Sequence, residues 1–335
     1  MVGIAIVGCG GMARAHAGNL LKIKEARVLA LVDPVPERTA AFKAEYFPKA
    51  ACYKDLNALL KSPPKGLDGV ILVTPHTQHH AQAKKALLAG FHVLVEKPMV
   101  TDSKQGYDLW RTVKKTGRKL AIAFQAPYSP EFAWIAEQRD SGKLGKMELV
   151  NAWLCQGWLG GTRGTWRQQP RLSGGGQMYD SGAHAFNSVM WLVGEPVVEV
   201  SCFYDNCGAP VDINGVAVMK FANGTIASMA IGGNCPAFST DLNISTPKFR
   251  VLTNQYGGKL EVTGADRKPF TPKLRKARSP VAGSPQGNFI DAILGRAKLK
   301  STVRHGVMLS VLMDALYESA RTRRIVRVKP VPEKL

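Results

Sequence analysis

The chain has 335 residues, of which 45% are hydrophobic and 21% charged, a composition typical of globular proteins and not of disordered or repetitive ones. Because single hydrophobic cores stop growing at roughly 250–300 residues, this length predicts two domains. The formal net charge is +20, but the basic residues are spread along the chain without an aromatic-interleaved stripe, so we expect no specific nucleic-acid partner and leave an acidic or phosphorylated substrate open.

The chain begins directly with an apolar, strand-like run, without the basic start and long apolar stretch of a secretion signal. No apolar run reaches membrane-spanning length. The 6 cysteines are scattered, with no C-x-x-C pair and no spacing typical of zinc ligands. We therefore expect a cytoplasmic, reduced protein without membrane contact and without a metal ion.

Residues 1–125 alternate short apolar runs with helix-like segments. The apolar runs are GIAIVG, RVLALVD, GVILVT, HVLVEK and KLAIAF, and the segment from His79 to Leu88 has the Ala, Leu and Lys content of a helix. Strands that alternate with helices pair in parallel through βαβ crossovers, and the helices cover both faces of the sheet. The pattern predicts an α/β fold whose N-terminal domain, residues 1–125, is a Rossmann doubly wound parallel sheet.

Residues 126–335 have longer strand-like runs. These are KMELVNAWL, VVEVSCFY, GVAVMKFANGTIASMAIGG and KFRVLTN, and the third contains Asn223-Gly224, a strong hairpin signal. Two late helices, near Asn288–Leu294 and His305–Arg321, precede a final strand, Arg324–Val328. We predict a C-terminal α+β domain for substrate binding and oligomerisation, with a large, mostly antiparallel open sheet. Whether its last helices pack back on the first domain stays open.

The turn after the first run fits the dinucleotide-binding pattern G-x-G-x-x-G/A. Its residues are Gly8, Cys9, Gly10, Gly11, Met12 and Ala13, and a helix-forming run to Leu21 follows. In such a turn Gly8 allows the tight bend, Gly10 leaves room for a pyrophosphate, and Ala13 permits close packing of helix on strand. The helix N-terminus then offers free N–H groups to the anion. A tight turn without a ligand is the alternative for an isolated pattern of this kind.

Asp33 ends the second apolar run, about 20 residues after this turn, where a carboxylate accepts hydrogen bonds from ribose hydroxyls. A carboxylate there also repels a ribose 2′-phosphate, so we expect NAD as cofactor, with NADP less favoured. Arg38 either offsets part of that repulsion at the cofactor or lies on the surface of a first helical turn.

With the motif Glu96-Lys97-Pro98, the sequence resembles the glucose–fructose oxidoreductase, inositol dehydrogenase and rhizopine catabolism (Gfo/Idh/MocA) family. The resemblance runs nearly end to end, through GCGGMA, VTPHTQHH, LLAGFHVLVEKPMV, WRQQPRLSGGGQMYDSGAHAFNSVMWLVGEP, NFIDAIL and DALYESARTRRIVRV. Two positions depart from the usual family pattern: Phe124–Tyr128 replaces an arginine-aromatic pair, and Asn187 stands where many relatives have an acid.

The resemblance implies three catalytic residues that also contact substrate: Lys97 in E-K-P, and Asp180 and His184 in G-G-G-x-x-x-D-x-x-x-H. Independently of the resemblance, the spacing of four residues between Asp180 and His184 predicts that these two share one helix face. We expect His184 to act as general base, Lys97 to stabilise charge on the reacting oxygen, and Asp180 to orient the substrate or His184. Taken singly, each residue type is also common in solvated surface positions.

The VTPHTQHH segment resembles the family's loop beside the nicotinamide ribose, which implies cofactor contacts from Thr74, His76 and His79. Glu96 either contacts the cofactor or orients Lys97. A metal site formed by the histidines is not expected, because no carboxylate or cysteine nearby completes a ligand set.

The segment from Gln156 to Ser173 combines tryptophans and arginines among glycines. Aromatic faces suit a carbohydrate ring and an arginine suits a carboxylate or phosphate, so Trp166 and Arg167 are predicted to bind substrate. Trp158 belongs either to this site or to a subunit interface.

Together these features predict an NAD-dependent oxidoreductase that transfers a hydride between nicotinamide and a hydroxyl carbon of a sugar, sugar derivative or polyol, working as a homodimer or homotetramer. A redox-neutral glycosidase or epimerase that retains NAD and oxidises a sugar transiently is the main alternative. A non-catalytic sugar sensor on the same fold is a third.

Overall fold

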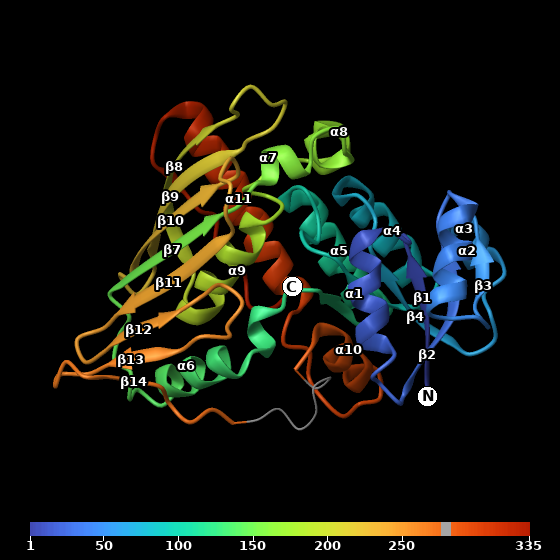
Figure 1. Cartoon of the computed structure of the whole chain (residues 1–335), viewed down its shortest axis with the longest axis horizontal. Helices are drawn as coiled ribbons and strands as arrows, with labels where there is room; N and C mark the ends of the chain where they lie inside the picture. The colour runs from blue at the N-terminus through green and yellow to red at the C-terminus, as the bar shows by residue number, and fades with distance from the viewer. Residues whose placement is uncertain (276–282) are drawn as a thin grey trace.

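The computed structural model describes residues 1–275 and 283–335, which form two sheets with helices between and around them (Figure 1). The first sheet is parallel throughout and has six strands in the order β3-β2-β1-β4-β5-β6. The strands are β1 (Val2–Val7), β2 (Ala26–Val32), β3 (Ala51–Tyr53), β4 (Leu67–Leu72), β5 (His92–Val95) and β6 (Leu120–Ile122). This order confirms the predicted Rossmann sheet.

Five helices connect these strands: α1 (Gly11–Leu20), α2 (Pro36–Glu45), α3 (Leu56–Lys61), α4 (His76–Leu88) and α5 (Ser103–Thr116). Their ends follow local chemistry. The Asp102 side chain accepts the backbone N–H of Gln105 at the start of α5, and Gly117 ends the helix with a positive φ. Strand β3 was not predicted, because Ala51 and Cys52 are exposed and form no apolar run.

The second sheet has nine strands in the order β14-β13-β12-β11-β7-β10-β9-β8-β15. They are β7 (Leu149–Cys155), β8 (Val197–Asp205), β9 (Asn214–Phe221), β10 (Ile226–Gly232), β11 (Ser239–Ser245), β12 (Arg250–Thr253), β13 (Glu261–Thr263), β14 (Pro269–Phe270) and β15 (Val326–Arg327). Every pairing is antiparallel except that of β7 with β10, so the predicted mostly antiparallel sheet is confirmed. The hairpin predicted at Asn223-Gly224 joins β9 and β10, and Gly224 has a φ of +85°.

The described part of the second half of the chain also contains six helices. They are α6 (Pro130–Asp140), the short α7 (Trp158–Gly161) and α8 (Pro170–Ser173), α9 (Gly182–Val193), α10 (Pro285–Ile293) and α11 (Val303–Thr322), with 3-10 turns at Ala126–Tyr128 and Trp166–Gln168. Of these, α9 contacts β7 and β10, and α11 contacts β8, whereas α10 lies beside α1 (Figure 1). In the part of the chain that the structure describes, no helix is long and apolar enough to cross a membrane.

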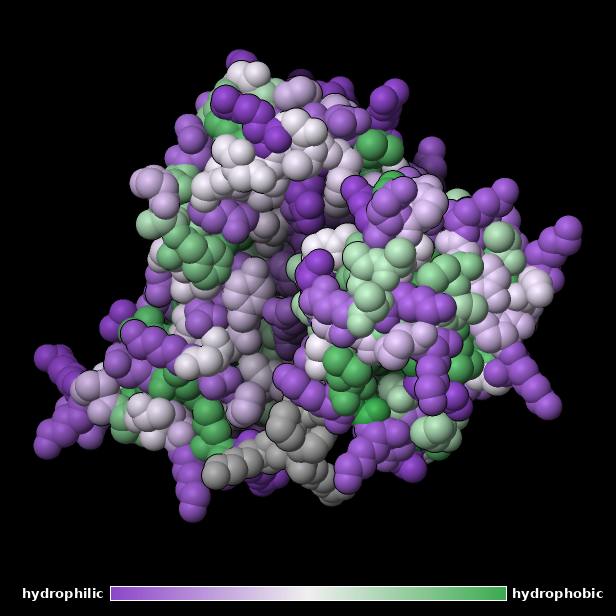
Figure 2. Space-filling view, turned by 45° about the vertical axis from the view of Figure 1, so that its right-hand side comes forward, coloured by the Kyte–Doolittle hydropathy of each residue, from purple (hydrophilic) through white to green (hydrophobic). Residues whose placement is uncertain are grey.

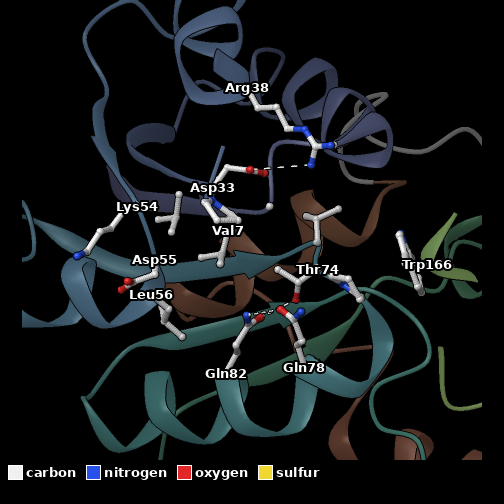
Figure 3. A pocket seen from close by; sticks show the side chains of 16 residues that line it. Val7, Asp33, Arg38, Lys54, Asp55, Leu56, Thr74, Gln78, Gln82 and Trp166 are labelled. Atoms are coloured by element: carbon white, nitrogen blue, oxygen red, sulfur yellow. Dashed lines mark hydrogen bonds and ion pairs between the residues drawn. The ribbon is translucent and has the colours of Figure 1, made fainter. Parts of the chain in front are cut away.

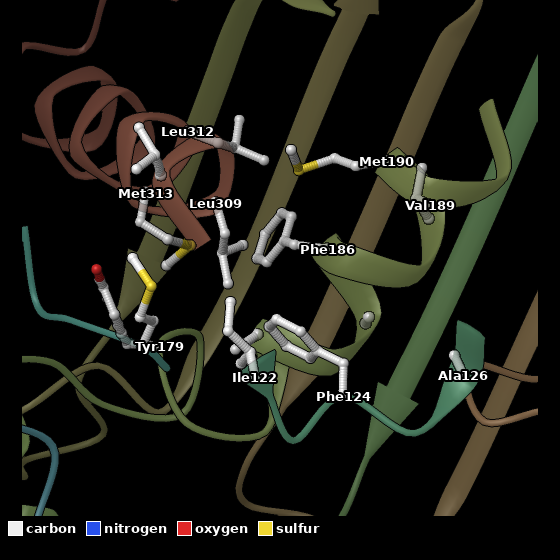
Figure 4. Packing of buried hydrophobic residues seen from close by; sticks show 14 of the residues in the cluster. Ile122, Phe124, Ala126, Tyr179, Phe186, Val189, Met190, Leu309, Leu312 and Met313 are labelled. Carbon is white, nitrogen blue, oxygen red and sulfur yellow. The ribbon is translucent and has the colours of Figure 1, made fainter. Parts of the chain in front are cut away.

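The last helices pack back on the first half of the chain. Helix α11 lies along α5, and the backbone N–H of Ile122 in β6 donates to Ser301 O at 3.2 Å. Leu309 and Leu312 of α11 pack against Phe186 of α9 in a hydrophobic cluster that reaches both sheets (Figure 4). The two halves therefore meet through a continuous apolar core, and the clefts between them have rigid walls.

Candidate active site

The glycine turn between β1 and α1 leaves space above its backbone. Gly8 has a φ of +95°, and a Cβ there would lie 2.5 Å from Val73 O, so only glycine fits. A Cβ at Gly10 or Gly11 would meet nothing within 4 Å, and Ala13 is fully buried under the turn. This cradle at the N-terminus of a ten-residue helix suits a pyrophosphate.

The carboxylate of Asp33 sits beside this turn at the end of β2. Its two oxygens accept the backbone N–H groups of Cys9 and Val35, each at 2.9 Å, which fixes its orientation. The guanidinium of Arg38 lies 3.9 Å from Asp33 and is more than half exposed. The structure thus brings Asp33 and Arg38 together beside the glycine turn.

A pocket of about 350 Å³ joins the glycine turn to Asp33 (Figure 3). Gly8, Gly10, Asp33, Arg38 and Thr74, all predicted, line it, together with Lys54, Gln78 and Gln82, which were not. Trp166 reaches the pocket from the second half of the chain (Figure 3). The space over the glycine turn and the oriented carboxylate fit a nicotinamide adenine dinucleotide.

Two histidines of the strand-end segment are buried and do not line this pocket. Both ring nitrogens of His79 lie 2.8 Å from backbone carbonyls, those of Thr74 and Pro98, and the residue has no exposed surface. His79 therefore holds the loop beside the cis Lys97–Pro98 peptide, which corrects its prediction as a direct cofactor contact.

His76, also predicted as a cofactor contact, instead joins α4 to the segment from Gln156 to Ser173. Its Nδ1 lies 3.0 Å from Ser173 O, and its ring meets Trp166 edge-on at 4.7 Å between centroids. Burial, with a smaller effect from Lys97, lowers the pKa of His76 to about 3, so the ring is neutral at neutral pH.

Lys97 and Asp180 form the centre of the site. The ammonium group of Lys97 donates to Asp180 Oδ1 at 2.6 Å and to its backbone oxygen at 2.9 Å, and both side chains are buried. The other carboxylate oxygen accepts Trp158 Nε1 and Arg167 Nε, each at 2.9 Å. Burial alone would raise the pKa of Asp180, but Lys97, His76 and Arg167 hold it well below its ordinary value.

Trp158 was left between this site and a subunit interface, and the structure places it in the site. Arg167 also stacks over Trp166, with its guanidinium carbon 4.6 Å from the ring centroid. The two predicted substrate residues thus form one unit that bridges the cofactor pocket and Asp180.

His184 lies on α9, half-buried, with its ring against Tyr256 and Phe124 at centroid distances of 5.2 and 6.0 Å. Burial and the nearby charge of Lys97 lower the pKa of His184 to about 3, against smaller opposite effects of Glu96 and Asp180. The ring is therefore neutral at neutral pH.

One part of the prediction for this motif is wrong. Helix α9 begins at Gly182, so Asp180 lies in the preceding turn and does not share a helix face with His184. The turn is held by buried Asp212, whose carboxylate oxygens accept the backbone N–H groups of Gly176 and Met178, each at 2.8 Å. As a result Asp180 points toward Lys97, and we propose that its role is to orient the Lys97 side chain.

Glu96, which precedes Lys97 in the chain, belongs to a second set of polar side chains, formed with His16 and Gln286. Its Oε1 lies 2.8 Å from His16 Nε2, and His16 Nδ1 lies 2.8 Å from Gln286 Nε2 on α10. Burial would raise the pKa of Glu96, but the hydrogen bond with His16 and the charges of His16 and Lys97 outweigh it and lower the pKa to about 2. Glu96 is thus ionised beside the ammonium group of Lys97.

A pocket of about 280 Å³ opens at this point between the two halves of the chain, where the surface is hollowed (Figure 2). Met12, which was predicted to contact the cofactor, lines it, as do His16, Glu96, Gln125 and Tyr256. Sequence reasoning missed His16, Gln125 and Tyr256, since each carries no local motif. Within the described ranges no group of three His, Cys, Asp or Glu side chains is arranged to hold a metal ion.

Comparison with known proteins shows the family of the chain. The family profile "Oxidoreductase family, NAD-binding Rossmann fold" matches residues 2–124, and that of the GFO/IDH/MocA C-terminal domain matches residues 132–255. The chain is 28% identical over 232 residues to 1-carboxy-3-chloro-3,4-dihydroxycyclo hexa-1,5-diene dehydrogenase of Comamonas testosteroni, an alignment that covers 69% of this chain and 57% of that protein. The matched region is thus little more than half of that relative's length.

Inositol 2-dehydrogenase 4 of Saccharopolyspora erythraea is 26% identical over 238 residues, covering 69% of this chain and 67% of that protein. Among solved structures, the WlbA dehydrogenase from Bordetella pertussis, in complex with NADH and UDP-GlcNAcA, has the same fold. Its TM-score is 0.84 at 21% identity, with 98% of each chain covered.

Proposed function

Because the chain belongs to the Gfo/Idh/MocA family of oxidoreductases, we propose that it transfers a hydride between a nicotinamide cofactor and a hydroxyl-bearing carbon of a sugar, sugar derivative or polyol. The observation that carries the proposal is the meeting of Lys97 and Asp180, whose Nζ and Oδ1 lie 2.6 Å apart, close enough to His184 for their charges to act on its ring. The relatives named as dehydrogenases of a ring diol and of inositol support a hydroxyl substrate.

We propose NAD as the cofactor. The residues that would hold it are the glycine turn at Gly8–Ala13, Asp33 and Thr74, and the bound nicotinamide supplies the hydride acceptor. The buried carboxylate of Asp33 disfavours a 2′-phosphate. Arg38 and Lys54, which line the same pocket, are the groups that would favour one.

The chain's own residues then handle the proton and the charge. The neutral ring of His184 accepts the hydroxyl proton of the substrate, a contribution of about 10²–10⁴-fold. The ammonium group of Lys97 donates to the same oxygen and stabilises the negative charge that develops there. Asp180 holds Lys97 in place, and Trp166 with Arg167 covers the substrate position from the loop side.

The direct test is the absorbance of reduced nicotinamide after purified protein is mixed with a panel of sugars, sugar acids, sugar phosphates and inositols, with NAD or with NADP. We expect reduction of NAD by one substrate class. Silence with the whole panel, from protein shown to contain tightly bound NAD, would contradict net dehydrogenation and favour transient oxidation in a redox-neutral reaction.

We further propose that the chain forms a homodimer or homotetramer through the open face of the second sheet. Trp153, Ala230, Val216 and Phe203 are paired across four adjacent strands, and the side chains of Trp153, Val216 and Phe203 are 45%, 51% and 66% exposed. Soluble monomers rarely expose so continuous an apolar row.

The oligomer is tested by sedimentation of the wild-type chain and of a Trp153→Lys, Val216→Lys double variant, which should be monomeric. Lys115→Glu, a charge change on the exposed surface of α5 and outside the second sheet, is the control and should leave the assembly intact. A monomeric wild-type chain would contradict the proposal.

A further inference from the structure

A third pocket, outside the site described above, lies where α6, α9 and α11 meet. Its volume is about 230 Å³, and it is lined by Arg139, Asn187, Trp191, Gly194, Arg304 and His305 together with two methionines. Two arginines line it and no acidic residue does. Its character is therefore that of a concave, cationic surface.

The two arginines keep hydrogen-bonding capacity for a ligand. Arg139 uses Nη1 for the carbonyls of Trp191 and Leu192 at the end of α9, and Nε for Asp140. These bonds fix the guanidinium, and across the described ranges its Nη2 donates to no protein group. Such a rigidly held guanidinium is well suited to binding an oxyanion.

Arg304 has no carboxylate within ion-pair distance in the part of the chain described. Its nitrogens reach only neutral acceptors, namely Pro332 O at 2.9 Å, Val331 O at 3.5 Å and Met308 Sδ at 3.2 Å. Its charge is therefore uncompensated by any described residue, although the side chain is only partly exposed. An anion in the pocket would supply the missing countercharge.

The amide of Asn187 points to the same ligand class. The residue is 4% exposed, and its Nδ2 has no hydrogen-bond partner among the residues described. A buried amide N–H without an acceptor is unfavourable, so an acceptor at this place is expected.

His305 adds a further donor. The backbone N–H of Thr302 donates to His305 Nδ1 at 3.1 Å, so the neutral ring carries its proton on Nε2. Burial, together with Arg304, lowers the pKa of His305 to about 4, which makes the neutral form the relevant one at neutral pH.

We infer that this pocket binds a small anion through a phosphate or carboxylate group, held between Arg139 and Arg304 and hydrogen-bonded by Asn187. The pocket supplies donors and positive charge, which is the chemistry that either group requires, and Asp140, the one carboxylate paired with Arg139, does not line it. Asn187 follows His184 by three residues on α9, so the ligand would contact the helix that carries the proposed base. The inference does not depend on the proposed oxidoreductase activity.

The test is calorimetric titration of the full chain with sodium phosphate, sodium sulfate and sodium acetate, in the presence of NAD so that the glycine turn does not compete. We expect saturable binding of phosphate and sulfate if the pocket takes a phosphoryl group, or of acetate if it takes a carboxylate. No saturable heat with any of the three anions would overturn the inference.

Variants locate the binding. Asn187→Asp keeps the side-chain shape but places a negative charge in the pocket, and Arg304→Gln removes a cation, so each should weaken anion binding at least about tenfold. Arg111→Gln, which removes one exposed arginine from α5, is the matched control and should bind as the wild type does. Wild-type affinity in both pocket variants would show that the anion binds elsewhere.

A melting measurement separates binding from folding. Without added anion, the new carboxylate of Asn187→Asp should pair with the arginines and raise the melting temperature above that of the wild type. Phosphate should then stabilise the wild type but not this variant. Equal stabilisation of both by phosphate would contradict the inference.

Discussion

Three donors surround the carboxylate of Asp180, namely Lys97, Trp158 and Arg167. The neutral ring of His76 lies 3.7 Å from it. A carboxylate so occupied is a poor proton acceptor, and its low pKa keeps it ionised throughout the working pH range. Of the three residues we propose His184 as the proton acceptor, because its ring has no hydrogen-bond partner among the described residues, and we propose that Asp180 acts by holding Lys97.

Lys97→Ala and His184→Ala should each lower turnover by about 10²–10⁴-fold, because they remove the charge-stabilising donor and the proton acceptor. The dissociation constant for NAD should change little, since neither side chain lines the pocket at the glycine turn. Turnover and NAD binding are measured on the same preparations. Lys115→Ala, on the surface of α5, is the control, and near-normal turnover in both site variants would refute the assigned roles.

Asp33→Ser should weaken the preference for NAD over NADP by at least about tenfold, equivalent to about 1.4 kcal/mol, since it removes the charge that repels a 2′-phosphate. The measurement is the ratio of kcat/KM for the two cofactors. Arg38→Gln should change the ratio in the opposite direction, because Arg38 is the cation nearest Asp33. An unchanged ratio in Asp33→Ser would show that Asp33 does not discriminate between the ribose groups of NAD and NADP.

Among the elements, the turn from Gly174 to Asp180 controls the catalytic geometry. It is held from outside by Asp212, on the connection between β8 and β9, and Asp212 is in turn bonded to Tyr317 Oη of α11 at 2.6 Å. A Cβ at Gly176 would lie 2.0 Å from Asp212 O, so the contact requires glycine.

Asp212→Asn should lower the free energy of unfolding by about 1–3 kcal/mol, because its NH₂ group cannot accept the backbone N–H that the carboxylate now accepts. Turnover should fall further than stability alone accounts for, because Asp180 would lose its position. Urea unfolding and turnover at a temperature where the variant stays folded separate the two effects. Tyr317→Phe, which removes only the hydroxyl bond, should cost about 1 kcal/mol and leave turnover nearly unchanged.

At this scale the sequence predicts well what periodicity and turn chemistry determine. The five apolar runs of the first half all became strands, and Asn223-Gly224 became a hairpin. Strand β11 was missed because its sequence, STDLNIS, has only two apolar residues, and it exists through its pairing with β7 and β12. Likewise the spacing of Asp180 and His184 fits a helix, but the bonds from Asp212 hold the first of them in a turn, and those bonds come from a distant segment.

On the scale of the whole molecule, stability should depend on pH through buried histidines. Folding lowers the pKa of His76 and His184 to about 3 and that of His305 to about 4, from an ordinary value of about 6.5. Between these values the unfolded chain binds protons that the folded one does not. The free energy of unfolding should therefore fall as the pH drops below about 6.5, by at most about 1.4 kcal/mol per pH unit for each histidine.

Urea unfolding at pH 7.5, 6.5, 5.5 and 4.5 measures this slope. His305→Gln should make it shallower, because glutamine preserves the capping bond to Thr302 but does not titrate. The acids with lowered pKa, among them Glu96 and Asp180, begin to contribute only near their ordinary pKa values of 4.5 and 3.8, at the acid end of this range. Stability that is constant from pH 7.5 to 4.5 would contradict the assignment.

How the pockets are completed could not be predicted from local sequence. Trp166 reaches the cofactor pocket, and Gln286 contacts His16 across 270 positions of sequence. Lys54 lines the pocket from the bend after β3, a strand of only three residues. The family motifs predicted that Lys97, Asp180 and His184 belong to one site. The residues around them could not be predicted, because they are brought there by the packing of the two halves of the chain.

The return of α11 to the first half has a consequence for synthesis on the ribosome. Strand β6 is bridged by residues 301 and 302, and α5 is covered by a helix that starts at Val303. Some 180 residues separate β6 from α11, and translating them at about 5–20 residues per second takes roughly 10–40 s. During that interval the apolar side of α5 is exposed on the nascent chain, so we expect this surface, and not the cofactor pocket, to be where chaperones engage it.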